Sequence, residues 1–161
     1  MPREPDGPGM SPEELLDVAN GSLAGWNDAM GLRFVRVSFD EVVAELKISS
    51  HHLQPYGVVH GGVYAGIIET TASVGAAFNA MKRGRSAVGL ENHTSFLKAV
   101  REGVLRVTAR PLVRGSRTQV WEATVTDGAG QAVATGRVRM LALEGDAPLA
   151  GEKVDVKLPG G

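Results

Sequence analysis

One carboxylate, Glu69, stands in a predominantly apolar stretch that covers residues 60–78. A helix that is apolar on nearly all sides is typical of a protein interior. An ionised glutamate is costly to bury there unless it is paired, hydrogen-bonded or used in chemistry. Glu69 could instead cap a buried arginine or face solvent. Because its neighbours are apolar and a glycine-rich segment precedes it, we favour a functional role.

The face of the predicted helix around Glu69 is otherwise small. Residues three and four apart lie on one helix face, and the residues that share this face with Glu69 are Gly62, Gly66, Ser73 and Ala76. Serine can satisfy itself by bonding back to the preceding turn, whereas glutamate does so less easily. The small residues leave space for a ligand or for another helix.

The start of this helix, His60-Gly61-Gly62, is the second candidate element. Backbone N–H groups are free at a helix N-terminus, where the helix dipole is positive. Such a site suits a developing oxyanion on an acyl carbonyl. A tight turn that needs glycine is the plainer interpretation, and the pairing with Glu69 favours the chemical one.

The separation of the two elements has a consequence for assembly. Gly61 and Glu69 are eight residues apart, or about 12 Å of helix rise. A glutamate side chain is too short to reach a carbonyl held at its own helix N-terminus. If both groups act on one carbonyl carbon, they come from different subunits, so we expect an obligate two-fold dimer with two sites.

Further polar residues lie before and after the helix. Of the loop residues, we interpret Gln54 and His60 as hydrogen-bond donors near the helix start, and His51 and His52 as solvated. No Asp or Glu lies in this cluster, so no metal is expected. In the strand that follows, alternation puts His93 and Ser95 on one face and Asn92 and Thr94 on the other, and either pair could line a pocket.

Two basic runs follow the helix. Arg114-Gly115-Ser116-Arg117 is a turn with two guanidinium groups, the usual partners of phosphate oxygens, although a solvated hairpin is an equal alternative. For Lys82-Arg83-Gly84-Arg85 we favour a solvated role.

The elements that position these residues are read from periodicity. Strands are predicted over 32–39, 42–48, 87–97, 104–113, 118–126 and 132–143, with the long helix over 60–82 between the second and third. Short turns between strands imply antiparallel neighbours. One helix against one sheet indicates an α+β fold in which the antiparallel sheet wraps around the helix.

Composition limits the function further. With 161 residues, a net charge of −1 and no cysteine, the chain is large enough for one domain and offers no thiol nucleophile or general attraction for nucleic acid. No apolar run approaches the ~20 residues that cross a membrane, and the first residues lack the apolar stretch of a signal peptide. We expect a cytoplasmic protein without nucleic-acid or membrane partners.

A family resemblance rests on Gln54, on Val59-His60-Gly61-Gly62-Val63, on Glu69 and Ser73, and on the run from Asn92 to Gly103. Over roughly residues 27–143, the sequence resembles the hotdog-fold acyl-CoA thioesterases of the phenylacetate-degradation and 4-hydroxybenzoyl-CoA thioesterase type. The resemblance implies the hotdog domain in 27–144. Outside it, the Pro- and Gly-rich start and the helix signal at Ser11-Pro12 predict a disordered N-terminus and an accessory helix within 1–26, and composition predicts a flexible tail in 145–161.

The resemblance also implies residue roles. Glu69 would be the nucleophile or the general base, the Gly61 amide would polarise the thioester carbonyl with help from Gln54 and His60, and Ser73 would position the water or the carboxylate. The residues implied to bind the acyl or coenzyme A part of the substrate are Gly62, Asn92, His93, Ser95, Gly115, Ser116 and Arg117. Some relatives carry a functional histidine on the strand near Ser95, whereas the histidine of this sequence stands at position 93.

These residues together predict hydrolysis of an acyl-CoA to a free acid and coenzyme A, without metal or organic cofactor, since coenzyme A is part of the substrate. Homodimers that pair into a homotetramer are expected. A hotdog enoyl-CoA hydratase or dehydratase, which would share proton transfer between a histidine and a carboxylate, is one alternative. A non-catalytic acyl-CoA-binding regulator is the other.

Overall fold

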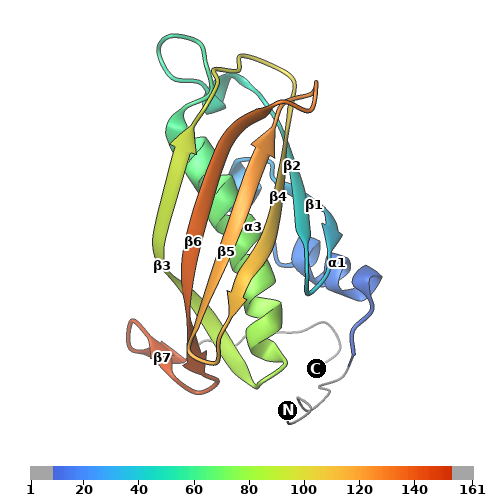
Figure 1. Ribbon diagram of the computed structural model, residues 1–161, viewed down its shortest axis with the longest axis vertical. Helices are drawn as coiled ribbons and strands as arrows, with labels where there is room; N and C mark the ends of the chain where they lie inside the picture. Colours follow the sequence, from blue (N-terminus) through green and yellow to red (C-terminus); the bar gives the residue numbers. More distant parts are fainter. Residues whose placement is uncertain (1–8, 154–161) are drawn as a thin grey trace.

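Helix α3, Gly61–Met81, forms the centre of the computed structural model, which describes residues 9–153 (Figure 1). The predicted range of 60–82 is confirmed to within one residue at each end. The helix is apolar on the side that faces the sheet, where Ile67, Ile68 and Ala72 are completely buried. His60 caps its first turn by accepting a hydrogen bond from the Gly62 N–H at Nδ1, 2.8 Å away.

One antiparallel sheet covers α3, with the strand order β1-β2-β4-β5-β6-β3. The strands are β1 Arg33–Val37, β2 Val42–Lys47, β3 Arg85–Phe96, β4 Val104–Arg114, β5 Thr118–Thr126 and β6 Ala132–Glu144. Alternating residues of β4, β5 and β6 point to α3 and are buried, among them Val107, Trp121 and Val138. The predicted α+β hotdog architecture, a sheet around one long helix, is confirmed.

The path between β3 and β4 differs from the prediction that short connections join neighbouring strands. β3 pairs with β6 at one edge of the sheet, whereas β4 pairs with β2 and β5 (Figure 1). The connection, residues 97–103, crosses the end of the sheet. Its backbone is held on both sides, because the Leu97 N–H donates to the Val133 carbonyl at 2.8 Å and the Gly103 carbonyl accepts from the Ile48 N–H at 2.9 Å.

The N-terminal segment packs against the same core. Helix α1, Pro12–Gly21, begins at a Ser11 capping box, and Leu15, Val18 and Ala19 are buried. Asn20 pairs with the Phe34 backbone, donating to its carbonyl and accepting from its N–H, both at 3.0 Å. Thus α1 contributes to the core of the domain, although the predicted domain range begins at residue 27. The short helix α2, Trp26–Ala29, follows.

The chain after β6 makes a small hairpin of β7, Pro148–Leu149, and β8, Glu152–Lys153. It occupies the first part of the segment predicted as a flexible tail. The rest of that segment and residues 1–8 of the predicted disordered N-terminus lie outside the described residues. No helix within residues 9–153 combines the length and hydrophobicity needed to cross a membrane.

Candidate active site

The Glu69 carboxylate lies at the border between α3 and β3, where two neutral side chains hold it. Ser73, one helical turn later, donates its hydroxyl to Oε1 at 3.1 Å. Asn92 of β3 donates its amide to Oε2 at 3.2 Å and also to the Ala65 carbonyl at 3.0 Å. Thr94 in turn donates to the Asn92 Oδ1 at 2.6 Å, which orients the amide. The carboxylate is therefore oriented by neutral donors, and no Lys, Arg or His within residues 9–153 pairs with it.

Gly89 of β3 also shapes this site, and it is a residue that sequence reasoning missed. A Cβ at this position would lie 2.5 Å from the Glu69 Oε1, so any side chain here would displace the carboxylate from the position it holds. The β3–β6 register shifts between Gly89 and Glu91. A glycine inside a predicted strand is a signal for a bulge or a close approach, and that signal was available in the sequence.

The start of α3 presents one open backbone donor. Within residues 9–153, the Gly61 N–H has no hydrogen-bond acceptor, while the Gly62 N–H is used by the His60 cap. The Phe96 ring lies over Gly61, 2.6 Å from the position of an added Cβ, and is 60% exposed. The Gly61 amide can therefore donate to an incoming oxygen at a positive helix end.

The loop before α3 brings Gln54 and His60 to the same end of the helix. Leu53 and Val59 form an isolated bridge, which closes residues 53–59 into a narrow loop. Gln54 Oε1 accepts from the Tyr56 N–H at 2.5 Å, so its amide nitrogen is directed away from that turn. Because His60 accepts at Nδ1, a neutral ring carries its proton on Nε2, where it can donate.

The prediction that His52 is solvated was wrong, whereas His51 is exposed. His52 is buried, donates from Nε2 to the Met30 carbonyl at 2.9 Å and accepts at Nδ1 from the Ser49 N–H at 2.9 Å. Burial lowers the pKa of His52 against the raising effect of its bond to Met30. Its role is structural. Among residues 9–153, no group of three or more His, Asp or Glu side chains is arranged to hold a metal ion.

Strand β3 separates the residues that were predicted to bind substrate. Asn92 reaches α3, so alternation directs His93 and Ser95 to the opposite face of the sheet. His93 lies opposite Arg137, which pairs with Glu122 on that exposed face. Of the two alternatives for this strand, the structure brings Asn92 and Thr94 to Glu69, and His93 and Ser95 lie away from it.

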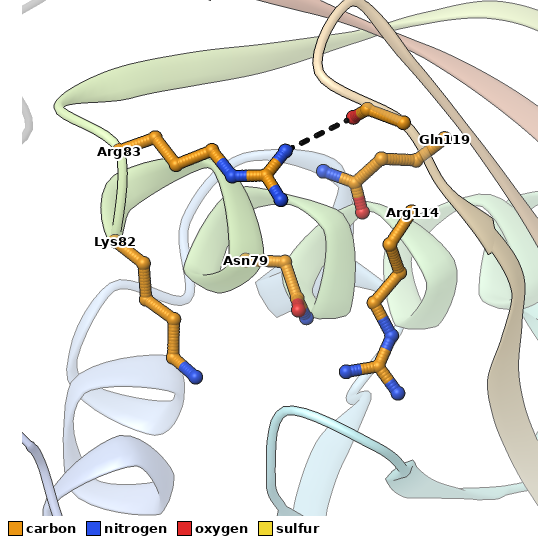
Figure 2. A pocket seen from close by; sticks show the side chains of 6 residues that line it. Asn79, Lys82, Arg83, Arg114 and Gln119 are labelled. Atoms are coloured by element: carbon orange, nitrogen blue, oxygen red, sulfur yellow. Dashed lines mark hydrogen bonds between the residues drawn. The ribbon is translucent and has the colours of Figure 1, made fainter. Parts of the chain in front are cut away.

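The two basic runs meet at the far end of α3 (Figure 2). Arg83 donates to the Gly115 carbonyl at 3.4 Å and Arg85 donates to the Ser116 carbonyl at 2.5 Å. A cavity of about 110 Å³ lies beside them, lined by Asn79, Lys82, Arg83, Arg114, Gly115 and Gln119. Lys82 and Arg83 are exposed, in line with the solvated interpretation of the 82–85 run, and Arg83 and Arg85 also hold the carbonyls of the 114–117 turn.

The small-residue face of α3 is not empty at its centre. The indole of Trp26, from α2, lies on Gly66, where a Cβ would overlap its benzo ring. Ala76 is completely buried and Gly62 is exposed, so the predicted face spans both environments. Gly62 and Gly66 lie on the side of α3 away from the sheet, whereas Glu69 and Ser73 lie at its border and contact β3 and Met140 of β6. Nothing in the sequence pattern placed Trp26 there.

Comparison with known proteins places this geometry in a family. The model of the thioesterase superfamily matches residues 56–134. A Mycobacterium tuberculosis protein that carries the name esterase is 42% identical over 122 residues, which are 74% of this chain and 86% of that protein. The 1,4-dihydroxy-2-naphthoyl-CoA hydrolase of Escherichia coli is 31% identical over 78% of this chain and 90% of its own length.

Solved structures agree. That of the same Mycobacterium tuberculosis protein superposes with a TM-score of 0.73 at 40% identity, covering 77% of this chain and 98% of the other. A thioesterase from Haemophilus influenzae, at 24% identity, shares the fold with a TM-score of 0.74 over 84% of this chain and 92% of its own.

Proposed function

This chain belongs to the thioesterase superfamily, and we propose that it hydrolyses an acyl-CoA thioester to a carboxylic acid and coenzyme A. The observation that carries the proposal is the Glu69 carboxylate, held by Ser73 and Asn92 on a helix whose N-terminus offers the Gly61 N–H. The name of the Escherichia coli relative, a hydrolase of a CoA thioester, supports the substrate class.

Two routes use the same carboxylate. As a general base, Glu69 takes a proton from water while the water oxygen attacks the thioester carbon and the carbonyl electrons move to oxygen. The C–S bond then breaks, and the leaving thiolate receives the proton. As a nucleophile, Glu69 attacks the carbon itself, expels the thiolate and forms an anhydride that water hydrolyses. In both routes a backbone N–H stabilises the oxyanion.

We assign that N–H to a second subunit. α3 is continuous from Gly61 to Glu69, so the two groups of one chain are about 12 Å apart along the helix. β3 is a twelve-residue edge strand with large apolar side chains exposed, including Leu90 and Phe96. A long apolar edge invites pairing with another chain. A second copy paired antiparallel along β3 would run its α3 past Glu69, which itself contacts β3.

Mixed dimers test this shared site. Gly61→Pro removes the N–H at the first helical position, where proline is tolerated, and Glu69→Ala removes the carboxylate. Each homodimer should be inactive. A co-purified mixed dimer should regain about half of wild-type turnover, because one of its two sites holds an intact Glu69 and an intact Gly61. An inactive mixed dimer would place both groups in one chain. Gly61→Ala, which keeps the N–H, is the matched control.

The substrate class is tested by release of free thiol from aromatic, short, medium and long acyl-CoAs, with enoyl-CoA absorbance followed in parallel. We expect thiol release that is lost in Glu69→Ala. Loss of the enoyl absorbance without thiol release would indicate a hydratase instead. Near-full activity in Glu69→Ala would contradict the proposed mechanism.

We further propose that the basic end of α3 binds the phosphates of coenzyme A, with contacts from Gly115, Ser116 and Arg117. The turn is held in shape by Arg83 and Arg85, and an added Cβ at Gly115 would lie 2.6 Å from the Thr118 carbonyl oxygen. Residue 79 at this end is ten residues beyond Glu69, or about 15 Å along the helix, so an extended pantetheine arm would have to bridge the two regions.

Arg117→Ala should raise KM for an acyl-CoA severalfold and leave KM for a short thioester without a nucleotide unchanged, because only the former carries phosphate. Steady-state kinetics with both substrates measure the difference. Arg106→Ala is the control, since Arg106 pairs with Glu45 on the other half of β4. Equal effects on both substrates would refute a phosphate role.

A further inference from the structure

Trp26 lies beside the proposed site without being part of the core. Its indole lies on Gly66 of α3, and 43% of the residue is exposed. Large aromatic side chains are usually more deeply buried in a monomer. Trp26 therefore leaves a large part of its apolar surface outside the packed core.

The position of Gly66 relates the indole to the reacting centre. Gly66 precedes Glu69 by three residues and Thr70 by four, so both are its neighbours on the helix surface. Glu69 lies on the β3 side, where Asn92 holds it. Thr70 lies on the α2 side, where its hydroxyl donates to the Asn27 Oδ1 at 2.6 Å. The indole thus covers the residue one helical turn before Glu69, on the side away from β3.

The segment that carries Trp26 is held in place at several points. Asn27, the next residue, is tied to Thr70 of α3. The Met30 carbonyl accepts from the buried His52, and the Leu32 N–H donates to the Asn27 carbonyl at 3.1 Å. Gly25 and Gly31 bracket α2 with φ of 57° and 70°, which glycine adopts without strain. The exposed indole is therefore presented by an ordered element.

We propose that Trp26 forms a wall of the acyl-binding site and makes the enzyme prefer flat aromatic acyl groups. This inference rests on the proposed thioester hydrolysis at Glu69. Beyond Gly66 the same face of α3 continues with Ser73 and Ala77, whose half-buried side chains are small and leave room beside the helix. An acyl group whose carbonyl lies at Glu69 can occupy this space against the indole. A planar ring gains stacking with an indole in addition to the area it buries, whereas an alkyl chain gains only the area.

The acyl selectivity of three Trp26 variants tests whether the indole lines the acyl-binding site. We compare kcat/KM for benzoyl-CoA and hexanoyl-CoA in Trp26→Phe, Trp26→Leu and Trp26→Ala. Removing the ring should lower the benzoyl-to-hexanoyl ratio about three- to tenfold in Trp26→Leu and Trp26→Ala, while Trp26→Phe keeps most of it. Leu112→Ala, which removes another half-exposed apolar side chain on β4, should leave the ratio unchanged. A ratio that does not fall in Trp26→Leu and Trp26→Ala overturns the proposal.

Fluorescence separates this inference from the proposed function. The probe is S-phenacyl-CoA, a thioether that cannot be hydrolysed, and the signal is the difference between wild type and Trp26→Phe, since the only other tryptophan is the buried Trp121. Quenching by the probe that is absent in Trp26→Phe supports the wall even if no thioester is hydrolysed. Without such quenching, or if Trp26→Ala is monomeric while wild type is dimeric, the indole is not an acyl wall.

Discussion

Two tryptophans contact glycines on opposite sides of α3, and they serve different purposes. Trp121 of β5 lies on Gly75, is completely buried and donates its Nε1–H to Gln119, which in turn donates to the Ala76 carbonyl. Trp26 of α2 lies on Gly66 and stays 43% exposed. The first contact closes the core between helix and sheet. The second covers Gly66, one helical turn before Glu69, and leaves part of the indole exposed. The same kind of tryptophan–glycine contact thus stabilises the core on one side of α3 and borders the proposed active site on the other.

The largest effect on activity is expected at Glu69, one helical turn after the glycine that Trp26 covers. Glu69→Gln keeps the size of the side chain but removes the basic or nucleophilic oxygen pair, so kcat for an acyl-CoA should fall by about 10²- to 10⁴-fold. The free energy of unfolding should stay nearly unchanged, because the Gln oxygen can accept from Asn92 while its NH2 donates to the Ser73 hydroxyl oxygen. Thiol-release kinetics and urea unfolding of the same preparation measure both. A large loss of stability would instead show that Glu69 has a structural role, as Trp121 and Gln119 have in the core.

The next largest effect is expected at the buried indole. Trp121→Ala should lower the free energy of unfolding by about 3–5 kcal/mol, because it opens a cavity between α3 and the sheet. Trp26→Ala should cost a smaller fraction of that amount, since the ring is half-exposed. Chemical unfolding of both variants is the measurement. Similar losses for the two would remove the distinction between the two contacts.

Matched glycine substitutions compare the two contacts more finely. Gly75→Ala and Gly66→Ala gain the same helix propensity, about 1 kcal/mol. At Gly75 the added methyl meets an indole enclosed by the core, and we expect net destabilisation of about 1–3 kcal/mol. At Gly66 the indole can swing toward solvent, so stability should change little while the acyl preference weakens. If both variants are equally destabilised, then Trp26 is as rigidly enclosed as Trp121.

The smallest expected effect is the pH dependence of stability that His52 causes, the buried histidine that holds the Met30 carbonyl after α2. Burial lowers the pKa of His52 beneath its ordinary value of 6.5, so the unfolded chain binds the proton more readily than the folded one. Its contribution to stability is therefore present above pH 6.5 and is lost as the pH falls through the folded-state pKa. Unfolding free energies at pH 7.5 and 5.5 should differ more in wild type than in His52→Gln. His51→Gln, at an exposed position, should behave as wild type.

Local pattern identified most of what is local in this chain. The predominantly apolar run of 60–78 predicted α3, and the small residues that share a face with Glu69 predicted space there for a ligand or another helix. Alternation in β3 separated Asn92 and Thr94 from His93 and Ser95, but could not choose which pair faces the helix. That choice depends on the register with β6 and on the bulge beside Gly89, both set by long-range pairing.

The sequence by itself determined the α+β architecture of a sheet around one helix, the central helix and its lone carboxylate, because hydrophobic periodicity and glycine positions encode them over short distances. Only the tertiary structure decided which distant residues contact one another. It brought Asn92 and Gly89 to Glu69, joined the basic runs at the end of α3, buried His52 and laid Trp26 on Gly66. These contacts join residues up to dozens of positions apart, and their partners are chosen by packing of the whole core, which no local pattern records.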